Sequence, residues 1–218
     1  MKIRKITNEN LEKNAEAVKN HPKYGEENKL IDKALKIHKY NEEISVVAMK
    51  IALIDLTNGT NLGRNLGTKG GIRLLAQKII DSQFDERVKN GDITIVEELA
   101  RWTKKVFKRN LFSFISKYCL YHNVHVYDRD DYAIYDSVIA ENIHKYISKE
   151  EYYAITGEKL YKNSIIKLKE SYRYKTYLHV INFIIEKNEI SVDKPHRKLD
   201  WYIWFKNKPK KVKMKLNK

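Results

Sequence analysis

The chain is poor in the two residues that interrupt helices, and this scarcity constrains its fold more than any other feature. Its 218 residues include three prolines and eight glycines, and five of the glycines fall within residues 57–71. Elsewhere, apolar residues recur at the three- and four-residue spacing of amphipathic helices. The sequence therefore predicts an all-α fold.

The same periodicity predicts where individual helices lie. We expect helices over 8–20, 26–39, 43–56, 72–82, 94–107, 112–121, 135–147 and 199–206, and one long or two broken helices over 163–187. Ser148 and Glu151 form a capping box that opens a further short helix. In the helix over 26–39, the residues expected on the buried face are Leu30, Ile31, Ala34, Leu35 and Ile37. No break in composition marks a second domain, so residues 1–218 are expected to form one domain with a basic tail at 207–218.

The net charge and the cysteine content limit which partners and which cellular compartment are expected. Lys and Arg number 43 against 28 for Asp and Glu, which gives a formal net charge of +15. A nucleic-acid backbone is the first partner that this charge suggests, and an anionic membrane surface the second. The alternative is an ordinary basic composition. The chain shows no secretory signal and no apolar run of about 18 residues, so we expect a soluble, cytoplasmic, nucleoid-associated protein. A single cysteine, Cys119, excludes an internal disulfide.

A lysine in an apolar helix is the first candidate for chemistry. Burying a charged amine costs several kcal/mol unless the amine is paired or neutral. A buried amine in its neutral form is also a nucleophile. Asp136 follows 19 residues after this lysine, at the expected start of the next helix. The alternative is a lysine that extends to solvent and an ordinary N-cap aspartate. The lysine is Lys117, and its neighbours are Phe114, Ile115, Tyr118, Cys119 and Leu120.

Two basic connections are candidates for phosphate contact. The helices over 94–107 and 112–121 predict a helix-hairpin-helix unit whose connection could offer backbone amides and the side chains of Lys108, Arg109 and Asn110. An ordinary αα-hairpin is the alternative. The glycine-rich stretch 57–71 carries Arg64 and Lys69 and is either a DNA-facing loop or a flexible connection.

Two segments carry a resemblance to a known family. The segments are SKYCLYHN…YAIYDSVI, which contains Lys117 and Asp136, and LDWYIW, which begins at Leu199. They resemble the helix-hairpin-helix DNA glycosylases that also cleave abasic sites, in particular 8-oxoguanine glycosylases of the bacterial and archaeal type. The resemblance covers about residues 43–206. Where the family has an LPGVGxK-like hairpin, this chain has KRNLFSFISK, which contains no glycine.

The resemblance implies a fold, an activity and a mechanism. The fold would be a two-lobed helix-hairpin-helix glycosylase with its active-site cleft between the lobes. The activity would be that of a bifunctional DNA glycosylase and AP lyase, with 8-oxoguanine as the first choice of base. Lys117 would be the Schiff-base nucleophile and Asp136 its assisting carboxylate, without a metal or a cofactor. The partner would be double-stranded DNA that contains a damaged or modified base, and the protein would act as a monomer.

The resemblance also implies a base pocket. Trp204 and Asp200 occupy the tryptophan and the aspartate of the LDxYIW segment. Trp201, Trp204 and Tyr202 could stack on an extruded base. The alternative is that one tryptophan belongs to the core. Asn58 and Asn61 could fill the gap that a flipped nucleotide leaves, although asparagines are equally expected in turns.

Other functions compete with this reading. A basic module that binds nucleic acid without catalysis is the first, and a glycosylase that acts on modified phage bases in defence is the second. A helical structural protein is disfavoured by the net charge. A metal site is a further alternative, because loose ligand spacing is present, but such residues are more often solvated surface. The residues concerned are His122, His125, Asp128, Asp130 and Asp131.

Overall fold

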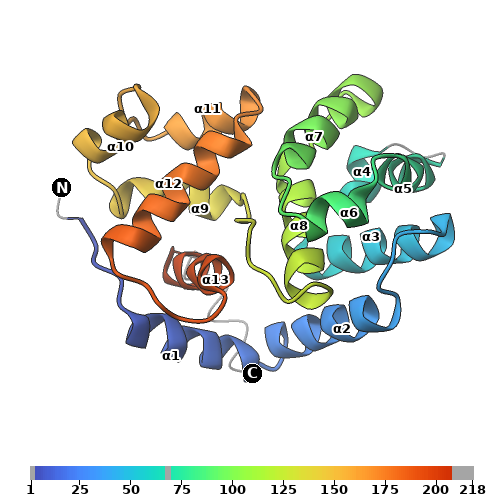
Figure 1. Ribbon diagram of the computed structural model, residues 1–218, viewed down its shortest axis with the longest axis horizontal. Coiled ribbons are helices and arrows are strands. Elements are labelled where there is room, and N and C mark those ends of the chain that lie inside the picture. The colour runs from blue at the N-terminus through green and yellow to red at the C-terminus, as the bar shows by residue number, and fades with distance from the viewer. Residues whose placement is uncertain (1–2, 67–69, 208–218) are drawn as a thin grey trace.

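The computed structural model describes residues 3–66 and 70–207, and within them the predicted all-α fold is confirmed. Figure 1 shows helices and no strand in this part of the chain. The helices are α1 (Asn8–Lys19), α2 (Tyr24–Ile37), α3 (Ile44–Asn58), α4 (Leu62–Asn65), α5 (Gly71–Asp81), α6 (Phe84–Lys89), α7 (Thr94–Phe107), α8 (Phe112–His125), α9 (Ser137–Asn142), the 3-10 helix η1 (Ile143–Lys145), α10 (Lys149–Thr156), α11 (Ser164–Glu170), α12 (Tyr174–Lys187) and α13 (Pro195–Asn207). Lys69 and the expected basic tail from 208 onward lie outside the described residues.

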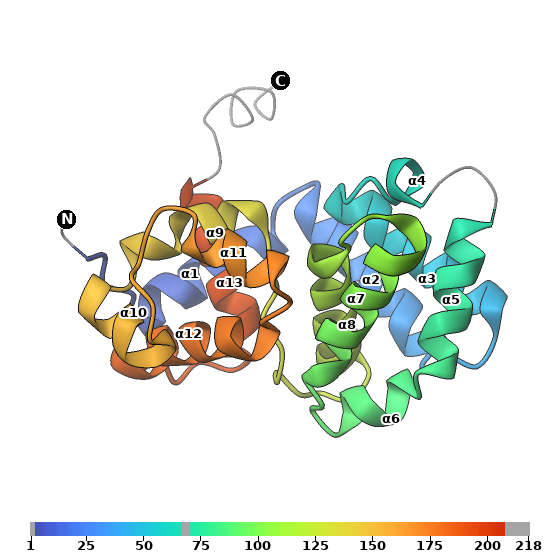
Figure 2. The ribbon, with the colours of Figure 1, turned by 90° about the horizontal axis from the view of Figure 1, so that it is seen from above.

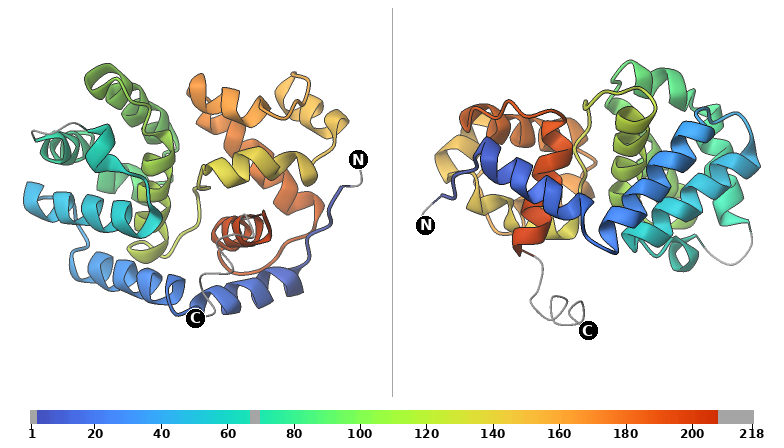
Figure 3. Two further views of the ribbon diagram at one scale, coloured as in Figure 1. Left: turned by 180° about the vertical axis from the view of Figure 1, so that it is seen from behind. Right: turned by 90° about the horizontal axis from the view of Figure 1, so that it is seen from below.

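The helices gather into two groups that face each other. Helices α2 to α8 form one group, and α1 with α9 to α13 forms the other (Figures 1 and 2). In the first group α3 packs on α5 and α7 packs on α8, and in the second α13 packs on α1 and α9. Helices α1 and α2 follow one another along the base of both groups, as the view from behind shows (Figure 3). Helix α8 thereby comes to face α9 and α13 across the boundary.

Helix α8 is the central helix of its group. From Phe112 to Asn123 every residue except Ser113 is buried. Helices α2, α3, α6 and α7 pack around it, which is the expected environment of a helix that is apolar on all sides. Lys117 lies in the middle of this helix.

Helix boundaries differ from the predictions where turns intervene. The segment 163–187 is broken, because α11 ends at Glu170 and Tyr172 takes a φ of +57° before α12 begins. Helix α13 begins at Pro195 rather than at residue 199, since proline is favourable in the first turn of a helix. Helices α4 and α6 were not predicted. The capping box is confirmed: Ser148 Oγ accepts from the Glu151 amide at 3.1 Å, and Glu151 Oε2 accepts from the Ser148 amide at 2.7 Å.

The predicted buried face of α2 is only partly correct. Ile31 and Leu35 are 1% exposed, but Leu30 is 55% exposed and Ile37 63% exposed. A helix that packs on one side buries a single stripe of residues, and the predicted buried face was wider than this stripe. In the part of the chain that the structure covers, no helix combines the length and the apolar character needed to cross a bilayer.

Candidate active site between the two groups of helices

The lysine and the aspartate that the sequence singled out are in contact. Lys117 of α8 is 5% exposed, and its Nζ lies 3.2 Å from Asp136 Oδ2. Asp136 is the N-cap of α9, where its Oδ1 accepts from the Val138 amide at 2.7 Å. One carboxylate oxygen therefore holds the helix and the other holds the amine. The ion pair joins the two groups of helices.

The amine has a second polar partner one helical turn earlier. Lys117 Nζ donates to Ser113 Oγ at 3.1 Å. Residues four apart lie on the same face of a helix, so α8 itself brings the side chains of Ser113 and Lys117 together. Ser113 and Asp136 thus hold the amine from two different helices.

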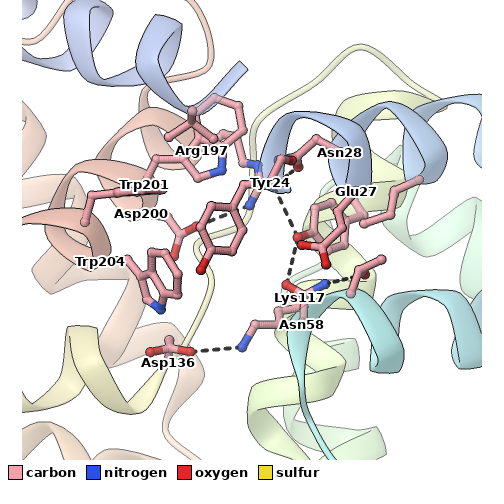
Figure 4. Close-up of a pocket in the computed structure, with 15 residues that line it drawn as sticks. Tyr24, Glu27, Asn28, Asn58, Lys117, Asp136, Arg197, Asp200, Trp201 and Trp204 are labelled. Carbon is pink, nitrogen blue, oxygen red and sulfur yellow. Dashed lines mark hydrogen bonds and ion pairs between the residues drawn. The ribbon is translucent and has the colours of Figure 1, made fainter. Parts of the chain in front are cut away.

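Two cavities meet at this pair. The inner cavity has a volume of about 110 Å³ and is enclosed by α2, α8 and α13, while the outer cavity has a volume of about 460 Å³ and extends toward α11. Figure 4 shows the inner cavity with Lys117 and Asp136 on one side and the tryptophans of α13 on another. The residues common to both walls are Asn58, Lys117 and Asp136.

A buried arginine forms the back of the inner cavity. The guanidinium of Arg197 lies between two aromatic rings, 4.6 Å from the ring centres of Tyr121 and of Trp201. It donates to Asn28 Oδ1 at 2.7 Å, to the Tyr121 hydroxyl at 3.2 Å and to Asp200 Oδ2 at 3.2 Å. These contacts tie α13 to α2 and α8 beside the site.

Asp200 lines the same cavity with a carboxyl group that is largely out of water. Its side chain is 12% exposed. Burial, together with the charge of Asp136, raises the pKa of Asp200 to about 6 against the lowering effect of Arg197. A carboxyl group with this pKa can donate or accept a hydrogen bond near neutral pH.

The aromatic wall consists of Trp204 with two neighbours. The Trp204 ring centre lies 5.2 Å from that of Tyr24 and 4.9 Å from that of Phe205, both edge to face. The sequence placed Trp201, Trp204 and Asp200 in a common pocket, and all three line this cavity. Tyr202 does not belong with them. It is 7% exposed and its ring faces Tyr146, because it lies on the opposite side of α13.

Of the two asparagines near the end of α3, one reaches the site. Asn58 Oδ1 accepts from the Tyr121 hydroxyl at 2.9 Å, and the residue lines both cavities. Asn61 lines neither of these two cavities. It is exposed with a φ of +56° and donates to the Gly59 carbonyl, as a turn residue does. Arg64 is exposed on α4.

The connection between α7 and α8 exposes two charged side chains, and two of the amides that follow them are already hydrogen-bonded. The Thr103 hydroxyl accepts from the Leu111 amide at 3.3 Å, and Asn110 Oδ1 accepts from the Phe112 amide at 3.1 Å. These two amides are therefore not available to bind a phosphate, and the prediction is wrong for them. Lys108 and Arg109 are exposed, and Asn110 lines the outer cavity while it donates to the Lys169 carbonyl.

The histidines that had loose metal-ligand spacing have other partners. His122 Nδ1 lies 2.9 Å from the Tyr118 carbonyl, and His125 Nδ1 lies 2.8 Å from Asp32 Oδ1. Across the residues that the structure describes, no three His, Cys, Asp or Glu side chains gather as a metal site requires.

Sequence reasoning missed the contribution of α2 and of Arg197. Tyr24, Glu27 and Asn28 line the inner cavity, although they lie about 90 residues before Lys117. Nothing in their local sequence distinguishes them from other polar residues of an amphipathic helix. Arg197 could have been noticed from its position three residues before Asp200, which places both on one face of a helix.

Comparison with known proteins places the chain in a family. An uncharacterized protein of Haemophilus influenzae is 28% identical over 138 residues, which cover 63% of this chain and 57% of that protein. The chain thus matches little more than half the length of this relative. No solved structure matches. The HI_0787_N family model, described as an N-terminal domain, matches residues 10–132, a stretch that includes Lys117 but ends before Asp136. Because this match covers more than half of the chain, the chain belongs to the HI_0787_N family of N-terminal domains.

Proposed function

We propose that the protein is a DNA glycosylase with AP lyase activity that excises a damaged or modified base. One observation carries the proposal: the buried amine of Lys117 lies 3.2 Å from Asp136 at the wall shared by two cavities. An amine nucleophile, a carboxylate and an aromatic pocket are the groups that base excision through a Schiff base requires. Of the candidate bases, 8-oxoguanine is the first to test, because the resemblance of the sequence is to 8-oxoguanine glycosylases.

The proposed reaction uses each of these groups. The target nucleotide leaves the DNA stack, and its base enters the inner cavity beside Trp204. The unprotonated amine of Lys117 attacks the sugar C1′, and the bond from C1′ to the base breaks. The negative charge of Asp136 stabilises the positive charge that develops on the sugar. The nitrogen then loses a proton as the bond from C1′ to the ring oxygen breaks and that oxygen takes up a proton, which gives a Schiff base. Loss of a C2′ proton then expels the 3′ phosphate.

The proposal extends to the fold and to the approach of DNA. We propose that the two groups of helices correspond to the two lobes of a helix-hairpin-helix glycosylase, with α7 and α8 as the hairpin. The exposed side chains of Arg64, Lys108 and Arg109 then contact phosphates on the outer side of the site. With a net charge of +15, binding is expected to weaken steeply as salt rises.

Borohydride trapping tests the chemistry directly, because the reagent reduces a Schiff base to a stable amine. The purified protein is incubated with duplexes that contain an abasic site, 8-oxoguanine, a modified base of the phage type, or only normal bases. We expect a covalent adduct with the abasic duplex and with one of the base-containing duplexes. Lys117→Ala should abolish the adduct and Asp136→Asn should reduce it at least a hundredfold. Lys89→Ala is the matched control, since Lys89 is an exposed lysine of α6 that lines neither cavity.

The alternatives give different results. If the protein binds duplex DNA in a salt-dependent manner but traps none of the four duplexes, the lyase activity is refuted and a non-catalytic nucleic-acid-binding module is the better account. If only the duplex with a phage-type base and the abasic duplex form adducts, the chemistry stands and its substrate points to defence. An adduct that persists in Lys117→Ala would place the nucleophile elsewhere.

A further inference from the structure

Asp136 faces two demands that conflict. The amine of Lys117 must lose a proton before it attacks, and Asp136 Oδ2 lies at 3.2 Å, within reach of that proton. A carboxylate that takes the proton becomes neutral, and a neutral carboxyl group no longer stabilises positive charge on the sugar. Efficient chemistry therefore needs a second route by which the proton leaves the amine.

The structure provides one such group. Ser113 Oγ lies 3.1 Å from Lys117 Nζ and accepts a hydrogen bond from it. In contrast to the buried residues that follow it in α8, Ser113 is partly exposed, and it lines the outer cavity, the larger of the two. Its hydroxyl group thus touches the reacting nitrogen on one side and a space wide enough for water on the other.

We propose, on the basis of the proposed function of Lys117, that Ser113 is a catalytic residue that conducts the proton of the amine to solvent. In this step a bond from Nζ to hydrogen breaks and a bond from Oγ to that hydrogen forms. The original hydroxyl hydrogen of Ser113 passes to a water molecule in the outer cavity. The serine ends the step with the hydrogen that it took from the amine, and Asp136 keeps its negative charge. The amine then rotates about its last carbon–nitrogen bond, which turns the electron pair away from Ser113 and brings a remaining hydrogen toward Ser113 Oγ.

The same contacts aim the amine. A neutral amine has two hydrogens and one electron pair. When one hydrogen is donated to Asp136 Oδ2 and the other to Ser113 Oγ, the electron pair takes the remaining tetrahedral direction. An amine held by a single partner would rotate about the last carbon–nitrogen bond. Ser113 therefore limits the directions from which Lys117 can attack.

Other charged groups line the two cavities and contribute to any dependence on pH. They lie on four helices that surround the two cavities. The carboxylates are Glu27 of α2, Asp136 and Glu141 of α9, and Asp200 of α13, and the cations are Lys169 of α11 and Arg197 of α13. A variant at Ser113 leaves all of these groups in place, so its pH profile compared with that of the wild type isolates the hydroxyl group.

The test measures the rate of borohydride trapping on an abasic duplex from pH 6 to pH 9. We expect Ser113→Ala to slow trapping about tenfold near pH 7 and to approach the wild-type rate near pH 9, where solvent removes the proton. Ser113→Thr, which keeps a hydroxyl group, should restore the rate. Ser137→Ala is the matched control, because Ser137 also lines the outer cavity, whereas the amine is hydrogen-bonded to Ser113 and Asp136. Circular dichroism and the unfolding midpoint verify that each variant is folded.

The outcomes separate this inference from the function on which it rests. A folded Ser113→Ala variant that traps at the wild-type rate at every pH would refute the proton route and leave the lyase function intact. A reduction that is equal at all pH values would show that Ser113 only positions the amine, and would also overturn the route. If the wild type traps no abasic duplex, the proposed function fails and the role of Ser113 fails with it.

Discussion

Asp200 and Arg197 face each other 3.2 Å apart behind the inner cavity, three residues apart on α13. The arginine does not fully offset the burial of the carboxyl group, because the pKa of Asp200 is still raised to about 6. The folded chain therefore binds a proton at Asp200 more tightly than the unfolded chain between about pH 4 and pH 6. Within this range, protonation of Asp200 favours the folded state.

The first prediction concerns the stability of Asp200→Asn. A group whose folded pKa is raised contributes most below its unfolded pKa and loses that contribution as pH rises through the folded value. The free energy of unfolding of the wild type, minus that of Asp200→Asn, should fall by about 3 kcal/mol from pH 4 to pH 7. Urea unfolding at both pH values measures this difference. The attraction of Arg197 is already contained in the pKa of Asp200 and needs no separate correction. A difference that does not change with pH would contradict the raised pKa.

The second prediction concerns acid and His125. Burial, with help from Arg197, lowers the pKa of His125 to about 4, even though the hydrogen bond to Asp32 opposes the change. The unfolded chain binds the proton more tightly between pH 6.5 and pH 4, so the contribution of His125 to stability is lost as pH falls through this range. For His125 alone the loss is about 3 kcal/mol.

Comparison of the wild type with His125→Gln isolates this contribution, because Asp200 acts in the opposite direction over part of the same range. The wild type should lose more free energy of unfolding between pH 7 and pH 4.5 than the variant does. His122 also lowers stability as pH falls, since burial holds its pKa well below the usual value. It is present in both proteins, so its contribution is the same in each. Equal losses in the two proteins would show that His125 is charged in the folded state.

The third prediction concerns the turn between α7 and α8. Lys108 is the C-cap of α7 and has a φ of +58°, a conformation that costs a residue with a Cβ about 1 kcal/mol more than glycine. Lys108→Gly should therefore raise the free energy of unfolding by up to about 1 kcal/mol. Arg109→Gly serves as the control, because Arg109 does not have a positive φ and gains nothing from glycine. Chemical unfolding of both variants distinguishes the two cases, and equal effects would mean that the turn is not strained.

The fourth prediction concerns a lysine that has no part in the proposed chemistry. Lys50 is 0% exposed, and its Nζ donates to the carbonyl of Tyr40 at 3.0 Å and to Asn41 Oδ1 at 3.1 Å. Lys50→Met leaves these acceptors without their donor and should cost about 3 kcal/mol of stability. Lys39→Met, at an exposed neighbour, should cost less than about 0.5 kcal/mol. A similar loss of stability in the two variants would show that the buried hydrogen bonds of Lys50 do not stabilise the fold.

Local signals predicted the elements of this fold well. The scarcity of glycine and proline predicted helices, the capping box predicted the start of α10, and Asp136 was expected at the start of the helix that it caps. The resemblance to the glycosylase family, rather than the spacing alone, implied that Lys117 and Asp136 act together, and the two side chains are in contact. Each of these features depends on a few consecutive residues or on one short connection.

The remaining part of the site depends on how distant helices pack. No local pattern shows that Asn28 of α2 lies 2.7 Å from Arg197 of α13, because 169 residues separate them. The exposure of Leu30 and Ile37 has the same origin, since their helix packs on one side only. Packing also decides that Trp204 lines the cavity while Tyr202 faces Tyr146.

The ion pair that joins the two groups of helices has a consequence for the protein during its synthesis. Translation releases Lys117 before Asp136, and the wall of α13 that contains Trp201 and Trp204 appears more than 60 residues later. A nascent chain that has folded only as far as α8 carries Lys117, the proposed nucleophile, without Asp136 and without the aromatic wall. Such a chain has half of the proposed site, so the residues up to α13 must leave the ribosome before the proposed chemistry can take place.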